Sequence, residues 1–401
     1  MLLFVLEVNP SWSFRFASRS WFSIVFRRAG VVLDMGKASP LGHLSTLKAW
    51  QLKQLAFLTG LNSTGTKAQL CRALTDSMVR PPLASPRCRI LSVDMGVKNL
   101  AFCLLDLHEV PPDLEEADAQ KTDSQLSLHL SDWKRLDVSE RLVAKHGSVL
   151  ANPSPVIEDL ASEIKDVSSS GDQINLYAPS SLSKIAFGLA SEFLQYKPDY
   201  ILIERQRFRS GGAPAIQEWT VRVNMLESML WASLETMRHG YSQGVIAQGQ
   251  KFPDLLEMSP RRVGMFWLAR ENFFPTPADV ATSLTSPKEV VQTTESELKK
   301  RSFEKKDKIA LARHWLSLSM TTDDLTVDAN LAPMVASFCS PKSRASPRKN
   351  KDDEHEEVDG ADTSALSGKL DDLADCLVQA VTFALWEQNR ARVRDHVASQ
   401  A

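Results

Sequence analysis

Several features that would assign this chain to a common class of proteins are missing. No apolar run is long enough to cross a lipid bilayer, so the sequence predicts no membrane partner. The five cysteines are scattered and form no C-x-x-C pair, which argues against a disulfide framework or a zinc site and favours a reducing compartment. The net charge is only −2, so any surface that binds nucleic acid must be local.

Acidic residues are also scarce at the N-terminus, where Glu7 is the only acid before Asp34. The stretch "SWSFRFASRSWFSIVFRRAG" combines arginine with serine and aromatic residues, which is the composition of a mitochondrial presequence. We therefore predict that residues 1–38 are a presequence or an unstructured tail, and that the protein lies in the mitochondrial matrix. Met35 is an alternative start.

Two short helices are predicted within residues 41–79, the first ending at Gly60 and the second running from Ala68 to Met78. This hairpin resembles the SAP module, a helical DNA-binding unit, at Leu52, Lys53, Leu55, Gly60, Leu61, Gly65, Lys67 and Leu70. Lys67 and the N–H groups at the second helix start suit phosphate contacts. The alternative is a hairpin that docks on a protein or on the next domain.

The rest of the chain alternates apolar strands with amphipathic helices, which predicts an α/β domain over residues 87–395. Strands are predicted at residues 90–93, 100–105, 126–130, 133–138 and 198–204. Long helices are predicted at residues 182–196 and 215–239 and from residue 369 onward. The segment 322–366 is polar and charge-blocked, so we predict a disordered insertion there.

Acids stand at the ends of predicted elements. Asp94 ends the first strand, Glu204 ends a later buried strand, and Asp371, Asp372 and Asp375 open the helix "KLDDLADCLVQA". Acids in a first helical turn need no ligand, because the helix dipole favours them there. If the strands are neighbours, however, the carboxylates converge, and two Mg²⁺ ions about 3.5–4 Å apart would neutralise them and assist an in-line phosphoryl displacement.

Three segments together resemble a known family: "ILSVDMGVKNLAFCLL", "ILIERQRFRSGGAPAI" and "KLDDLADCLVQA". They are similar to the fungal mitochondrial Holliday-junction resolvases, the RuvC-like branch of the ribonuclease H fold. The resemblance implies a mixed sheet flanked by helices and preceded by the SAP-like hairpin. It also implies that the catalytic metal ligands are Asp94, Glu204, Asp375 and either Asp372, at the RuvC-type spacing of three, or Asp371, at a spacing of four.

The same resemblance implies a Mg²⁺-dependent endonuclease, with Mn²⁺ as a substitute, that resolves four-way DNA junctions by paired symmetric cuts. Two opposed strands must be cut, so we predict a twofold homodimer. The apolar stripe of the helix at 215–239, with Trp219, Met225 and Trp231, is either the dimer face or core. The alternatives are another ribonuclease H-fold nuclease, acting on RNA–DNA hybrids or as a transposase-like strand cutter, and a non-catalytic DNA-binding protein.

Two basic stretches are candidates for contacts with the DNA backbone. Directly after Glu204, the segment "RQRFRSGG" contains Arg205, Gln206, Arg207, Phe208 and Arg209, in which Phe208 is either a wedge at the junction centre or a core residue. The segment "EKKDKIALARHW" contributes Lys305, Lys306 and Lys308, for which a solvated charged face is the alternative. Lys98 and Asn99 either touch the scissile phosphate or serve as turn residues.

Overall fold

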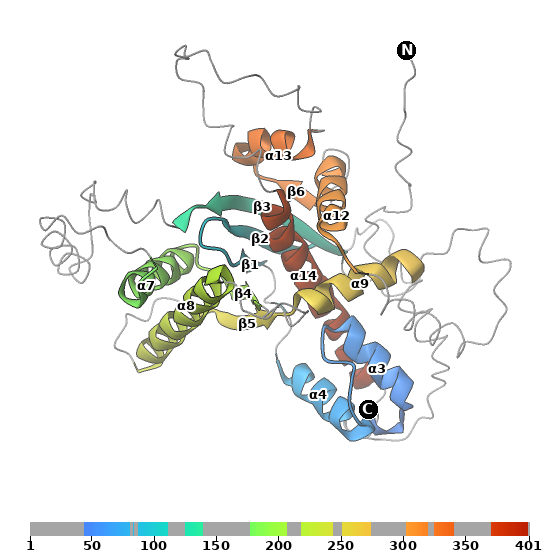
Figure 1. Ribbon diagram of the computed structural model, residues 1–401. Helices are drawn as coiled ribbons and strands as arrows, with labels where there is room; N and C mark the ends of the chain where they lie inside the picture. Colours follow the sequence, from blue (N-terminus) through green and yellow to red (C-terminus); the bar gives the residue numbers. More distant parts are fainter. Residues whose placement is uncertain are drawn as a thin grey trace, which may run out of the picture.

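A six-stranded mixed sheet forms the centre of the structure, a computed structural model that describes residues 44–80, 83, 87–110, 125–138, 177–206, 218–243, 251–273, 302–319, 325–340 and 370–399. The strand order is β5-β4-β1-β2-β3-β6 (Figure 1). The bounds are β1 Arg87–Asp94, β2 Leu100–Val110, β3 Gln125–Leu136, β4 Tyr200–Glu204, β5 Asp254–Met258 and β6 Leu325–Val327. β1, β2 and β3 are antiparallel neighbours, whereas β4, β5 and β6 each run parallel to the strand beside them.

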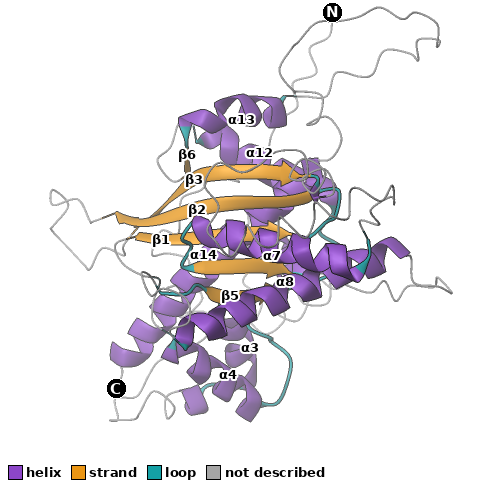
Figure 2. Ribbon diagram, turned by 90° about the vertical axis from the view of Figure 1, so that its left-hand side faces the viewer, coloured by secondary structure: helices purple, strands orange, loops and turns teal. Residues whose placement is uncertain are grey.

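Helices cover both faces of this sheet, as the resemblance predicted, and the predicted fold class is confirmed. One face packs on α7 and α8, and the other on α9, α12, α13 and α14 (Figure 1, Figure 2). The bounds are α7 Pro179–Gln195, α8 Glu218–Ser242, α9 Pro260–Phe273, α12 Lys305–Leu318, α13 Ala332–Cys339 and α14 Leu370–Ser399. Because both faces are covered, the neighbouring residues Ile90 and Leu91 are each fully buried although their side chains point to opposite faces.

The predicted N-terminal hairpin is present as α3, Ala49–Leu58, and α4, Lys67–Val79. Its leucines do not form a separate core, because Leu52 and Leu74 pack together with Val393 and Val397 from the far end of α14. The single helix α14 therefore runs from the central sheet to the hairpin (Figure 1).

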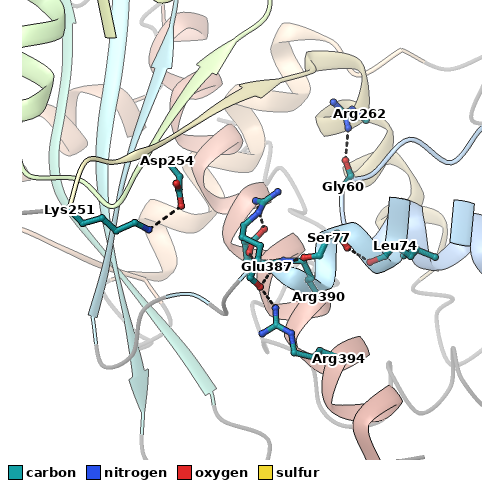
Figure 3. Close-up of polar contacts among 10 residues, drawn as sticks. Gly60, Leu74, Ser77, Lys251, Asp254, Arg262, Glu387, Arg390 and Arg394 are labelled. Atoms are coloured by element: carbon teal, nitrogen blue, oxygen red, sulfur yellow. Dashed lines mark hydrogen bonds and ion pairs between the residues drawn. The ribbon is translucent and has the colours of Figure 1, made fainter. Parts of the chain in front are cut away.

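Polar contacts fasten the hairpin to α9 and α14 (Figure 3). Arg262 Nη1 of α9 donates to the Gly60 carbonyl at 2.6 Å, just after α3. Arg390 Nη1 of α14 donates to the carbonyls of Ser77 and Arg80, both at 2.8 Å, at the end of α4. Carbonyls at a helix C-terminus lack partners within the helix, so these arginine contacts satisfy them and complement the dipole.

The structure corrects the prediction that 322–366 is a disordered insertion. Residues 325–340 of this segment form β6, the 3₁₀ turn Ala329–Leu331 and α13. Sparse apolar residues explain the error, because Leu325, Val335 and Phe338 are buried in the central core although the segment as a whole is polar. Residues 341–366 lie outside the described part of the chain, as do 1–38.

A smaller correction concerns β3, which is one strand where the sequence predicted two. The register shifts between Leu104 and Leu105, which pair with Asp132 and Leu130, so that Ser131 forms a bulge. Its hydroxyl donates to the Leu104 carbonyl at 3.3 Å. Ser131 and Asp132, which lie between the two predicted strands, are therefore part of one continuous strand.

The predicted apolar stripe of α8 is divided between core and surface. Met225 and Trp231 are partly buried against the core cluster on the α7 and α8 face, whereas Trp219 is 40% exposed. None of the described helices is both long and apolar enough to span a membrane.

Candidate metal centre

Three of the predicted acids meet at one edge of the sheet. Asp94 is the last residue of β1, and Glu204 is the last residue of β4. These two strands are parallel, with Val93 opposite Ile203, so both strands end side by side. Asp375 reaches the same point from the beginning of α14. Each residue offers a carboxylate oxygen, and these oxygens all lie within 4.8 Å of one another.

The start of α14 is held in place by side chains from three adjacent strands. Ser92 Oγ of β1 donates to the Cys376 carbonyl at 2.8 Å, and Cys103 Sγ of β2 donates to the same oxygen at 3.3 Å. Trp133 Nε1 of β3 donates to the Leu373 carbonyl at 3.0 Å. These contacts flank Asp375 along the helix and fix the side of α14 that faces the strand ends.

The negative form is disfavoured at two of the three carboxylates, Asp94 and Asp375. Burial raises the pKa of Asp94 well above its ordinary value, and the negative charges of Glu204, Asp375 and Asp372 raise it further. The pKa of Asp375 is raised as well, chiefly by burial. A cluster of hard oxygen ligands that resist ionisation together fits a divalent cation, which would remove the repulsion.

Asp371 and Asp372 do not belong to the group of three carboxylates. Asp371 forms an ion pair with Lys305 of α12. Asp372 acts on the cluster through its charge, which raises the pKa of Asp94. The choice between them as a fourth ligand stays open.

Lys308 has a different place from the one expected for a surface DNA contact. Its side chain is only 17% exposed, and its Nζ lies 2.6 Å from Asp375 Oδ1. Burial alone would lower the pKa of Lys308, but the charges of Asp375 and Glu204 outweigh burial and raise it. Lys308 of the predicted basic stretch therefore places its ammonium group in the acid cluster. No local pattern in the sequence indicated this position.

The other predicted DNA contacts lie around this edge or on the hairpin. Arg205 is exposed and pairs with Glu257 of β5 at 2.9 Å, and the Gln206 N–H donates to Glu227 of α8 at 3.3 Å. Lys98 and Asn99 follow Asp94 in the turn that leads to β2. Lys306 pairs with Glu304 at 3.0 Å. Lys67 is exposed at the start of α4. Arg207, Phe208 and Arg209 lie outside the described residues, so the choice between wedge and core is untested.

Comparison with known proteins identifies the family. Residues 90–393 match the family described as "Mitochondrial resolvase Ydc2 / RNA splicing MRS1". The chain belongs to this family. The predicted membership in the mitochondrial resolvases is thereby confirmed, and the matched residues include all the candidate metal ligands.

Two curated relatives of this resolvase family have the same name, mitochondrial cruciform cutting endonuclease 1. The protein from Schizosaccharomyces pombe is 31% identical over 225 residues, which are 56% of this chain and 68% of the relative. The protein from Saccharomyces cerevisiae is 22% identical over 362 residues, which are 88% of this chain and 86% of the relative. The names of the family and of both relatives confirm the predicted mitochondrial location.

Two solved structures were also found. The crystal structure of the yeast mitochondrial Holliday junction resolvase Ydc2 has a TM-score of 0.45 and 18% identity, and covers 88% of this chain and 99% of that chain. The Thermus thermophilus RuvC structure has a TM-score of 0.20 and 11% identity, and covers 53% of this chain and 96% of that chain.

Proposed function

We propose that this protein is a divalent-metal-dependent, structure-selective endonuclease that resolves four-way junctions in mitochondrial DNA. The observation that carries this proposal is the convergence of Asp94, Glu204 and Asp375, whose carboxylate oxygens lie within 4.8 Å of one another. The names of the two curated relatives, both cruciform cutting endonucleases, support the same substrate class.

Asp94, Glu204 and Asp375 would hold the metal, with Asp371 or Asp372 as a further ligand; two Mg²⁺ ions, or Mn²⁺ in their place, are the proposed cofactors. When bound, such ions supply an activated water as nucleophile and stabilise the departing 3′ oxygen. Lys308 stays protonated beside Asp375 and limits the negative charge that a DNA phosphate meets on approach. Both strand ends are fixed by the sheet, so the ligands are positioned before DNA arrives.

Recognition of a junction depends on shape and backbone contacts, because its bases are those of ordinary duplex DNA. Arg205 and Gln206 leave β4 directly after Glu204, next to the acid cluster. Arg207, Phe208 and Arg209 continue this segment, and we propose that they contact the junction centre.

The arms of the junction are the proposed partners of a second set of residues. These are Lys98, Asn99, Lys305 and Lys306 around the acid edge, and Lys67 on the hairpin. Each phosphate neutralised by such a residue makes binding weaken with salt. Paired cuts on opposed strands require two sites related by a twofold axis, so a homodimer is part of the proposal.

Substitution of Asp94 by asparagine tests the metal-dependent cleavage. Asp94→Asn removes a proposed ligand oxygen charge but no phosphate contact, so cleavage of a four-way junction in Mg²⁺ falls by more than about 100-fold. Junction binding, measured in Ca²⁺ or EDTA, stays close to wild type. Asp254→Asn, at a half-exposed position paired with Lys251, is the matched control and keeps full cleavage. Cleavage by Asp94→Asn at the wild-type rate would contradict the metal assignment.

The family description also includes an RNA splicing protein, which keeps other nucleic-acid substrates and a binding role without cleavage as second candidates. The three converged acids favour cleavage, because gathering mutually repelling carboxylates around one point destabilises the fold unless they hold a cation. Matched four-way junction, duplex and RNA–DNA hybrid substrates decide between these functions. We expect nicking of the junction alone, at symmetric positions on two strands.

A further inference from the structure

A polar bridge lies in the core directly beneath the acid cluster. Ser92 of β1 is fully buried and Gln379 of α14 is 2% exposed, so both have exchanged water for contacts inside the protein. Gln379 Nε2 donates to Ser92 Oγ at 3.0 Å, and Ser92 Oγ donates in turn to the Cys376 carbonyl at 2.8 Å. The hydrogen bonds thus form a chain from helix to strand and back to the helix.

Ser92 and Gln379 lie on the same two elements as Asp94 and Asp375, one step further from the edge of the sheet. Ser92 precedes Asp94 by two residues, so the two side chains point to the same face of β1 about 7 Å apart. Gln379 follows Asp375 by four residues, so both lie on one side of α14 about 6 Å apart. The carboxylate oxygens of Asp94 and Asp375 approach within 4.8 Å at one level between strand and helix, and the hydrogen bond between Ser92 and Gln379 joins the two elements at the next level.

Burying the Gln379 amide and the Ser92 hydroxyl costs free energy, because both groups must give up their hydration. An apolar pair would pack between β1 and α14 but would let the helix slide or turn against the strand. Directional hydrogen bonds define that separation more narrowly. Gln379 Nε2 also lies 3.4 Å from the Val93 carbonyl, next to Asp94 itself.

We propose that Ser92 and Gln379 are positioning residues that set the distance between Asp94 and Asp375, and thereby the geometry in which these carboxylates hold a divalent cation. The bridge touches no ligand atom of the metal centre and acts only through the strand and the helix. The proposal rests on the metal role given to the acids under the proposed function.

The test replaces Gln379 by methionine, which keeps the length and the apolar volume of the side chain but removes the donor. The readout is the Mn²⁺ concentration at which the melting temperature of the DNA-free protein rises half-maximally, with the Mg²⁺ concentration for half-maximal junction cleavage measured in parallel. We expect both concentrations to increase about tenfold, as for other residues that orient metal ligands. Junction affinity in EDTA stays at the wild-type value.

Thr382→Val is the matched control. Thr382 is also polar, fully buried and on α14, but its Oγ1 accepts from Trp267 Nε1 of α9 at 2.8 Å and makes no bridge to β1. This variant lowers the melting temperature without changing either metal concentration. A general loss of stability is thereby separated from a loss of ligand positioning.

Ser92→Ala is the second variant, for use if Gln379→Met does not fold, and it gives the same increase in both metal concentrations. Unchanged half-maximal concentrations in a folded Ser92 or Gln379 variant would overturn the proposal. Its failure is distinguishable from failure of the proposed function. A wild-type protein that is stabilised by Mn²⁺ but cuts no junction contradicts only the latter, and the DNA-free measurement still tests the bridge.

Discussion

Two buried aspartates of the central sheet have opposite surroundings. Burial raises the pKa of Asp94 and the neighbouring carboxylates raise it further, which is the arrangement expected where a cation binds. Asp106 is fully buried as well, but Arg89 Nε lies 2.7 Å from its Oδ1 and Arg87 Nη2 lies 3.3 Å from its Oδ2. Burial would raise the pKa of Asp106, yet the hydrogen bond and charge of Arg89 outweigh burial and lower it. The first aspartate is suited to ligand binding and the second to stability.

Removal of the Asp106 charge is therefore expected to destabilise the fold. Asp106→Asn removes the main counter-charge of the partly buried Arg89, leaving it only the weaker charge of Asp199. We expect the free energy of unfolding to fall by about 3 kcal/mol in urea denaturation. Because the pKa in the folded state is below the ordinary 3.8, the contribution of Asp106 is present above that pH and is lost as the pH falls below it. Wild type and Asp106→Asn thus converge in stability in acid, whereas a constant difference at every pH would contradict this account.

At the scale of elements, α14 has two tasks along its length. Its first turns carry Asp375 against the strand ends, and its last turns carry Val393 and Val397 into the hairpin core. Between Asp375 and Arg390 the helix rises about 22 Å. The hairpin packs closely against α14 at Gly60, where φ is +72° and a Cβ would overlap the Trp386 ring.

Gly60→Ala tests this close approach. The substitution puts a Cβ both into a left-handed backbone conformation and into the indole of Trp386, so we expect the free energy of unfolding to fall by about 2 kcal/mol. Gly188→Ala in α7 is the control, because a Cβ there meets nothing within 4 Å and alanine favours a helix by up to about 1 kcal/mol. Opposite signs in chemical denaturation are expected, and equal effects of the two variants would argue against a tight contact at Gly60.

For the whole molecule, the question is whether the hairpin and the nuclease domain act as one body. Arg80, at the end of α4, pairs with Glu387 at 3.3 Å. Glu387 also pairs with Arg390, whose side chain is 3% exposed (Figure 3). Asn389 Nδ2 adds a contact to the Leu58 carbonyl at 2.9 Å. Such directional contacts fix the orientation of the hairpin relative to the acid cluster. A DNA phosphate bound at Lys67 would therefore lie at a fixed distance from the phosphate that is cleaved at the acid cluster.

Arg390→Met is expected to loosen this connection without unfolding the sheet. It leaves Glu387 with only part of its charge compensated and removes the donor to the Ser77 carbonyl and one of the two arginine donors to the Arg80 carbonyl, which Arg394 still contacts. Amide hydrogen exchange in α3 and α4 is therefore expected to accelerate about 100-fold. Exchange in β1, β2 and β3 stays at the wild-type rate. Arg238→Met, which removes a half-exposed pair with Glu235 on α8, leaves the hairpin unchanged. Uniform acceleration throughout the sheet would show that the hairpin is not a separate cooperative unit.

The sequence alone determined the parts that depend on short-range patterns. The sequence predicts the apolar strands that end in Asp94 and Glu204, the acidic start of α14, and the hairpin with its glycine turns. These features are predictable because periodicity and turn residues act over a few positions. Only the tertiary structure decided which strands are neighbours and which residues join from afar. The pairing of β1 with β4, the approach of Lys308 to Asp375 and the folding of residues 325–340 depend on burial against distant segments, which local patterns do not encode.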